Sequence, residues 1–193
     1  MKILKTIAIL LLCSVPLMAA TDFADNVLIE PNATAVNLDR FPTPGAKFSP
    51  GTAPNATLTP FRSSEESWPG YFARYRTLRY VLAVSCGPIT DEPWRRARIG
   101  DFSGIELTIA YVQTSDVHFT TDEGLMIGDS LNTVMQKITV KEPWFTGNGE
   151  CIRLPSGWNA CFYIDDLVYD SNRGVFRPKE NAKVFRFLKD LPS

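Results

Sequence analysis

Two cysteines placed symmetrically about a short turn constrain this chain more than any other feature of its sequence. The stretch ECIRLPSGWNACFYI has Pro155-Ser156-Gly157 at its centre, which suits a three-residue hairpin turn with glycine in the left-handed third position. Counting outward from this turn places Cys151 opposite Cys161. If Leu154 and Trp158 form the hydrogen-bonded closing pair, the cysteines form a non-hydrogen-bonded pair with Cα atoms about 4.5 Å apart, within disulfide range. The sequence therefore predicts a stapled β-hairpin.

The same hairpin is the first candidate for a binding surface. Trp158 follows the turn and Trp144 precedes the first strand, while Arg153 and Asn159 face each other across the hairpin. A tryptophan on a pre-ordered turn is a typical interface anchor, although packing in the core explains a tryptophan equally well. We take these four residues as candidate binding residues for a protein partner.

Residues 1–20 have the order of a cleavable secretory signal: two lysines, a short apolar run and a small-residue end. Lipidation at Cys13 is not expected, because three leucines precede it. We therefore expect an exported protein, periplasmic or secreted, in a compartment where a disulfide persists. A reduced pair, or a bond from either hairpin cysteine to Cys86, is the alternative; otherwise Cys86 is a buried free thiol.

Charge and hydropathy narrow the range of partners. The signal holds two lysines and no acidic residue, so the 20 basic and 21 acidic residues of the chain become 18 and 21, a net charge of −3. This balance excludes a broad electrostatic surface for nucleic acid. No segment after the signal reaches the roughly 20 apolar residues of a spanning helix, so no membrane insertion is expected.

Proline content divides the rest of the chain. Residues 31–69 contain seven prolines and show neither helical nor strand periodicity, so residues 21–70 are predicted to be a proline-rich extended arm or linker. Residues 71–193 are predicted to form a single α+β domain, a small antiparallel sheet with one or two helices packed on one face.

Hydrophobic periodicity supplies the expected elements of this domain. Residues 77–85 and 104–114 are β-prone, and residues 117–121 are a candidate to pair with the second of these segments. Residues 71–78 also fit a helix. Residues 180–191 place apolar side chains at helical spacing but equally fit a last strand.

The tetrapeptide Gly128-Asp129-Ser130-Leu131 resembles the nucleophile block of the GDSL hydrolases. That resemblance implies a serine esterase, in which a histidine near the C-terminus activates the serine. Here the one histidine, His118, precedes Ser130, and too few residues follow to complete such a domain. The alternative is a helix start, because the apolar residues that follow recur at helical spacing and Asp129 or Ser130 is a preferred N-cap. We favour the helix start and treat the match as accidental.

A second resemblance covers residues 123–138, EGLMIGDSLNTVMQKI. This pattern is similar to the strand-to-helix entry of small exported α+β domains, namely the SmpA/OmlA outer-membrane-assembly lipoproteins and the β-lactamase inhibitor proteins. The resemblance implies a helix packed across a small antiparallel sheet. The lipobox cysteine of the lipoproteins is missing, so membrane anchoring is not carried over.

The remaining candidates for chemistry are weak. A single histidine cannot build a transition-metal site, and the acids around Asp165-Asp166 and Asp170 lack EF-hand spacing, so no metal or other cofactor is expected. Arginines interleaved with aromatic residues could form a surface for an acidic partner, or simply a solvated face. They are Arg74, Arg76, Arg79, Arg95, Arg96 and Arg98.

The function that these features favour is a non-enzymatic exported binding protein, such as an enzyme inhibitor or a toxin-immunity protein of the bacterial envelope. Its partner would be another protein in the envelope. An envelope assembly or structural accessory protein is the first alternative, and a serine esterase of the GDSL type is the second.

Overall fold

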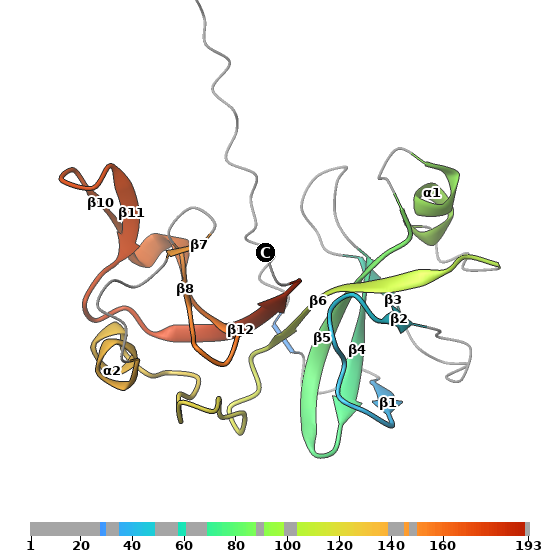
Figure 1. Ribbon diagram of the computed structural model, residues 1–193, viewed down its shortest axis with the longest axis horizontal. Coiled ribbons are helices and arrows are strands. Elements are labelled where there is room, and N and C mark those ends of the chain that lie inside the picture. Colours follow the sequence, from blue (N-terminus) through green and yellow to red (C-terminus); the bar gives the residue numbers. More distant parts are fainter. Residues whose placement is uncertain are drawn as a thin grey trace, which may run out of the picture.

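The computed structural model describes residues 28–29, 35–48, 58–60, 69–87, 91–98, 104–138, 145–146 and 150–191. Strands dominate these residues, with two seven-residue helices (Figure 1). The strands of the main sheet are β1 Val36–Leu38, β2 Lys47–Phe48, β3 Leu58–Pro60, β4 Pro69–Tyr75, β5 Leu78–Ser85, β6 Leu107–Thr114, β7 Phe145–Thr146, β8 Cys151–Arg153, β9 Asn159–Phe162 and β12 Val184–Asp190. The helices are α1 Glu92–Arg98 and α2 Leu131–Lys137.

The main sheet runs in the order β1-β4-β5-β6-β12-β9-β8-β7, with β2 on β6 and β3 on β4. Its pairs are antiparallel except β1 and β4, which are parallel, so the expectation of an antiparallel sheet is corrected to a mixed one. A parallel pair needs a long crossover connection, and the thirty residues between β1 and β4 provide it. The α+β class is otherwise consistent with the fold.

Parts of the proline-rich stretch belong to the sheet. β1, β2 and β3 all lie within residues 21–70, and each pairs with a strand of the sheet. The segment between β1 and β2, residues 39–46, is here called the strap; Phe41 and Ala46 from it pack against the main core. The predicted boundary at residue 70 therefore does not separate an arm from the packed sheet. Proline is tolerated because these strands are short and most of the prolines lie outside them.

One face of the sheet carries the main core. Tyr80, Leu82, Ile109, Val112 and Phe187 from three adjacent strands pack with Leu131, Val134 and Ile138 of α2 and its C-terminal cap. Helix α2 therefore covers this face, as the helical spacing predicts. None of the helices within the described ranges has the length and apolar character needed to cross a membrane.

Three open or provisional assignments are resolved. Residues 69–75 form β4 rather than a helix, and residues 184–190 form β12, so the C-terminal segment is a strand. Residues 117–121 do not pair with β6, whose edges are already occupied by β5, β2 and β12. Instead, the carboxylate of Asp116 accepts the backbone N–H of His118 and turns the chain away.

Two further strands form a separate antiparallel ribbon, β10 Leu167–Asp170 and β11 Val175–Pro178. A short 3-10 helix, Ile164–Asp166, connects β9 to it. Figure 1 shows the ribbon projecting from the main sheet, at the end of the molecule remote from α1. Residues 167–178 are called the ribbon below.

Candidate functional site

The disulfide hairpin has the register predicted from its turn. Cys151 pairs with Cys161 and Arg153 with Asn159, and a disulfide joins the two cysteines, whose Cα atoms are 4.0 Å apart. The backbone N–H of Leu154 donates to the carbonyl of Trp158 at 2.7 Å, which closes the hairpin. Cys86 is a free thiol, and partial burial raises its pKa.

Trp158 lies in the core, which is the alternative that the sequence leaves open for this side chain. Its side chain is 6% exposed, and its ring meets Phe119 at 4.9 Å and Phe41 of the strap at 6.2 Å between centroids. The Lys189 ammonium lies 5.6 Å from the ring centroid. Strand β9, which begins after Trp158, lies between β8 and β12, and Trp158 packs in the main core. Trp144, the other predicted anchor, lies outside the described residues.

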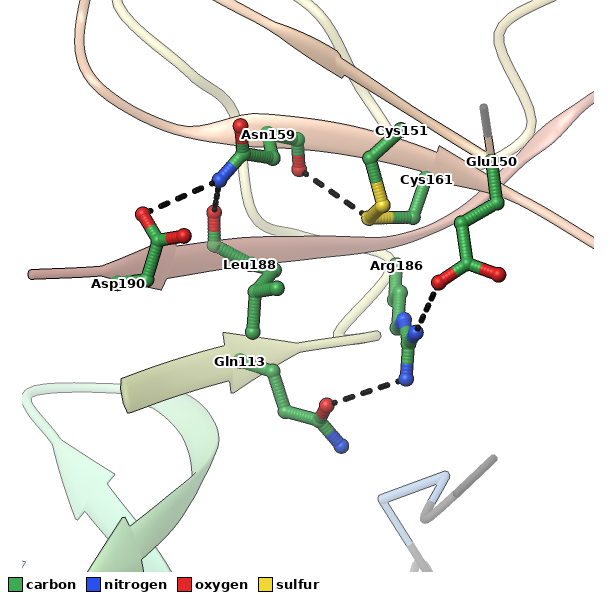
Figure 2. Close-up of a disulfide and its surroundings, with 8 residues drawn as sticks. All are labelled: Gln113, Glu150, Cys151, Asn159, Cys161, Arg186, Leu188 and Asp190. Carbon is green, nitrogen blue, oxygen red and sulfur yellow. Dashed lines mark hydrogen bonds and ion pairs between the residues drawn. A yellow bond between two sulfur atoms is a disulfide. The ribbon is translucent and has the colours of Figure 1, made fainter. Parts of the chain in front are cut away.

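Arg153 and Asn159 both contact β12, and Figure 2 shows the contacts of Asn159. Asn159 is fully buried, and its side-chain N–H donates to the carbonyl of Leu188 at 3.3 Å and to Asp190 at 3.4 Å. The Arg153 guanidinium pairs with the same Asp190 carboxylate at 3.4 Å. The structure thus brings two of the four predicted binding residues together, in a joint between the hairpin and β12.

A buried ion pair lies on the same side as the disulfide (Figure 2). Arg186 of β12 is 3.8 Å from the Glu150 carboxylate and 3.5 Å from the side-chain oxygen of Gln113. All three residues are at least nine-tenths buried. Buried charges are tolerated when they are paired in this way, and breaking one such pair is costly. We assign this cluster to the structure of the sheet.

Ser130 is the N-cap of α2. Its Oγ accepts the backbone N–H of Thr133 at 3.2 Å and lies 3.0 Å from the Thr133 hydroxyl. The Asp129 carboxylate accepts the backbone N–H of Met126 at 2.9 Å and lies 3.7 Å from the Lys137 ammonium. Both residues act in the turn that starts the helix, as the spacing predicts.

The single histidine is bound to a carboxylate. His118 Nδ1 is 3.1 Å from Asp116, and the imidazole is otherwise exposed. Partial burial would raise the pKa of Asp116, but hydrogen bonds from His118 and from the Arg79 backbone N–H outweigh it and lower that pKa. Within the described ranges, no group of three His, Cys, Asp or Glu side chains is arranged to hold a metal ion.

Five of the nine large exposed hydrophobic residues in the described part of the chain lie on or beside the ribbon. Tyr169 is 59% exposed and Phe176 49% exposed, and their rings meet at 5.3 Å between centroids. They lie directly opposite each other, so both project from one face. The other face carries the ion pair between Asp170 and Arg177 at 3.3 Å. The contact patch is defined as the exposed residues Tyr163, Ile164, Tyr169, Val175 and Phe176, of which Val175 pairs with Asp170 and lies on the other face of the ribbon.

The base of the ribbon is anchored to the disulfide. Tyr163 stacks on Phe185 with ring centroids 4.0 Å apart, and Phe185 packs in one cluster with Cys151 and Cys161. The backbone N–H of Lys179 donates to the carbonyl of Asp166 at 2.8 Å, extending the ribbon ladder to its base. The base of the contact patch is therefore held against the disulfide-linked part of the sheet.

Sequence reasoning did not identify this patch. The segment LVYDSNRGVFRP contains two short β-prone runs around a Ser-Asn-Arg-Gly turn, which is a recognisable hairpin signal. The local pattern does not show that, among the described residues, the two strands form a sheet of their own. The exposure of Tyr169 and Phe176 follows from topology and not from the local sequence.

No protein-family model, curated protein or solved structure matches this chain.

Proposed function

We propose that this chain is a non-enzymatic binding protein that acts in the periplasm or outside the cell, and that its protein partner docks on the contact patch. The observation that carries the proposal is the exposure of five apolar side chains on and beside the ribbon, while the predicted anchor Trp158 is buried. Clustered exposed apolar residues are a mark of interaction sites, whereas single ones are common anywhere on a surface.

The chemistry of the patch suits a protein surface. Tyrosine and phenylalanine are enriched at the centres of protein interfaces, because they bury much area for little loss of side-chain entropy. An isolated two-stranded ribbon is marginal in water, so a partner that covers Tyr169 and Phe176 would also stabilise it. The disulfide and the Tyr163–Phe185 stack would reduce the conformational entropy that the base of the ribbon loses when a partner binds.

Two lines of support favour an exported location. Residues 1–20 have the pattern of a secretory signal, and the disulfide between Cys151 and Cys161 requires an oxidising compartment to persist. The resemblance of residues 123–138 to exported inhibitor and assembly domains agrees with this location and with a binding role.

The role of Ser130 supports a non-enzymatic function. Its hydroxyl is engaged as a helix cap, and His118 is hydrogen-bonded to Asp116. Hydrolysis of short acyl esters by the purified protein is therefore expected to be absent. Hydrolysis that disappears in Ser130→Ala would instead support the esterase alternative.

The direct test is affinity capture of the tagged protein from whole cells, followed by mass spectrometry. The double variant Tyr169→Ser/Phe176→Ser should lose the captured partner. The control Val117→Ser/Met126→Ser also replaces two exposed apolar residues, but on another loop, and should retain the partner. Retention by both variants would contradict the proposal. Capture of an outer-membrane assembly complex would favour the accessory alternative over an inhibitor.

A further inference from the structure

The strap arches from β1 to β2 and is fastened to the sheet at its second half (Figure 1). A β-turn there is closed by the backbone N–H of Ala46, which donates to the carbonyl of Thr43 at 3.1 Å. Pro44 and Gly45 are the central residues of this turn, and Gly45 has a φ of +84°, as the third position of a type II turn requires. The Gly45 N–H and the Ala46 carbonyl bond to the backbone of Ile109 in β6 at 2.8 and 2.9 Å.

A cavity of about 540 Å³ lies against this arch. Residues 36–43 and 46–48 line it together with Ile109, so β1, the strap and β2 all contribute to its walls. Sites for small molecules have volumes of roughly 300–1,000 Å³ and are usually formed before the ligand arrives. A wall fixed by a proline turn and by backbone hydrogen bonds loses little conformational entropy when a ligand enters.

Apolar side chains form one part of this lining. Val36 is buried in a core cluster against which Leu38 and Phe48 pack, and Ile109 belongs to the main core. The Phe48 ring is held against the Tyr71 ring at 5.2 Å between centroids. The core therefore fixes the apolar part of the wall, which can receive an apolar group of a ligand.

The same lining carries charged side chains, and two of them have no ion-pair partner. Lys47 is neutralised by Glu106, whose carboxylate lies 2.7 Å from its ammonium. Asp39 and Arg40 are exposed, and neither is paired with any residue that the structure describes. The charge left for a ligand is therefore one acid and one base.

We propose that this cavity binds a small zwitterion, namely an amino acid or a short peptide with an apolar side chain. The Asp39 carboxylate accepts hydrogen bonds from the ligand ammonium, and the Arg40 guanidinium donates two to the ligand carboxylate. The apolar side chain of the ligand packs against Val36 and Phe48. The cavity and the contact patch share no residue, so this site does not depend on the proposed function.

The charge balance of the cavity decides against other small ligands. A phosphate or a dicarboxylate would be repelled by Asp39, and a simple amine would be repelled by Arg40. A wholly apolar compound would remove water from both side chains and return no hydrogen bond to either. A ligand with one ammonium and one carboxylate satisfies both.

The test is an NMR titration of the full labelled chain with leucine and with the dipeptide dileucine. The backbone amides of residues 36–48 should shift until the site is saturated, and those of the ribbon should not. N-acetyl-leucine lacks the ammonium and leucinamide lacks the carboxylate, so each should bind about fivefold more weakly than leucine, as expected for the loss of one exposed ion pair. Tighter binding of leucine would identify a free amino acid, and tighter binding of dileucine a peptide.

Two variants assign the charges. Asp39→Asn should weaken leucine binding about fivefold but leave N-acetyl-leucine unchanged, because that ligand has no ammonium. Arg40→Gln should weaken leucine binding equally but leave leucinamide unchanged. The matched controls Asp122→Asn and Arg173→Gln replace an exposed acid and an exposed base on other loops, and should bind leucine like the parent. All four changes are at exposed side chains, so each variant should retain the fold.

The absence of shifts at residues 36–48 with both leucine and dileucine would overturn the proposal. Equal binding of leucine, N-acetyl-leucine and leucinamide would contradict a zwitterionic ligand, and so would unchanged leucine binding in both Asp39→Asn and Arg40→Gln. Binding should also weaken as salt is added, because both charges are exposed.

Discussion

The disulfide hairpin β8–β9 and the ribbon β10–β11 follow each other in the chain and are built alike, as short antiparallel pairs joined by a tight turn with a glycine of positive φ. Their surroundings differ completely. Strand β9 has neighbours on both edges, and Trp158 beside it is buried, whereas β10 and β11 form a two-stranded sheet within the described residues, with Tyr169 exposed.

The aromatic side chains of the two hairpins are therefore expected to have different roles, one in stability and the other in partner binding. An aromatic side chain in the stapled hairpin stabilises the fold, because it fills space between the sheet and the strap. An aromatic side chain on the ribbon contacts little of the fold and remains open to a partner. Replacing an aromatic residue is therefore expected to lower stability in the disulfide hairpin and partner binding in the ribbon, although the two hairpins are adjacent in the sequence.

The largest expected effect is at Trp158. Trp158→Ala should lower the free energy of unfolding by about 3–5 kcal/mol, because it leaves a cavity among Phe41, Phe119 and Lys189. Tyr169→Ala should change it by less than about 0.5 kcal/mol. Urea denaturation of both variants measures the contrast. Similar losses at the two positions would remove the distinction between the hairpins.

Removal of the staple should have the next largest effect. Replacing Cys151 and Cys161 together by alanine should cost about 2–3 kcal/mol, the loop entropy of a cross-link spanning ten positions. The ribbon has no cross-link, so its hydrogen-exchange protection should already be the lower of the two in the parent protein. Equal protection in both hairpins would show that the ribbon is stabilised by contacts that the structure does not contain.

A smaller effect on stability is expected from the contacts made by the turns of the two hairpins. Glu123 reaches across to the turn of the disulfide hairpin, where its carboxylate accepts the N–H of Ser156 at 2.7 Å and the Ser156 hydroxyl at 2.9 Å. Partial burial alone would raise the pKa of Glu123, but these hydrogen bonds lower it below its ordinary value of 4.5. The turn of the ribbon has only local contacts, such as the one between Asp170 and the Asn172 N–H.

Glu123→Gln should therefore cost about 1 kcal/mol near neutral pH. Because the folded pKa is depressed, the contribution of Glu123 is present above pH 4.5 and disappears as the pH falls from 4.5 through the folded pKa. The stability difference between parent and variant should shrink in that window. A difference that stays constant down to pH 3 would contradict the assigned contact.

The features that the sequence predicts correctly are those whose determinants are local. The register of the disulfide hairpin follows from Gly157 and the count outward from it, and the start of α2 follows from the capping hydroxyl of Ser130 and the apolar spacing after it. Each of these determinants lies within about ten residues of the feature that it controls.

The features that sequence reasoning misses depend on distant segments. Trp158 is buried because Phe41, more than a hundred residues earlier, crosses the sheet in the strap. Tyr169 is exposed because β10 and β11 form a separate sheet and, among the described residues, no element packs over the face that carries it. Neither fact is encoded in the residues near the side chain.

The measurement that tests the central claim most directly is site-specific photo-crosslinking in living cells. A photoreactive phenylalanine derivative replaces Tyr169 on the ribbon or Val117 on the loop after β6, both of which are about 60% exposed. The account predicts that position 169 yields a discrete crosslinked protein and that position 117 does not. Crosslinking at position 117 alone, or the same product at both positions, would contradict the assignment of the ribbon as the contact surface.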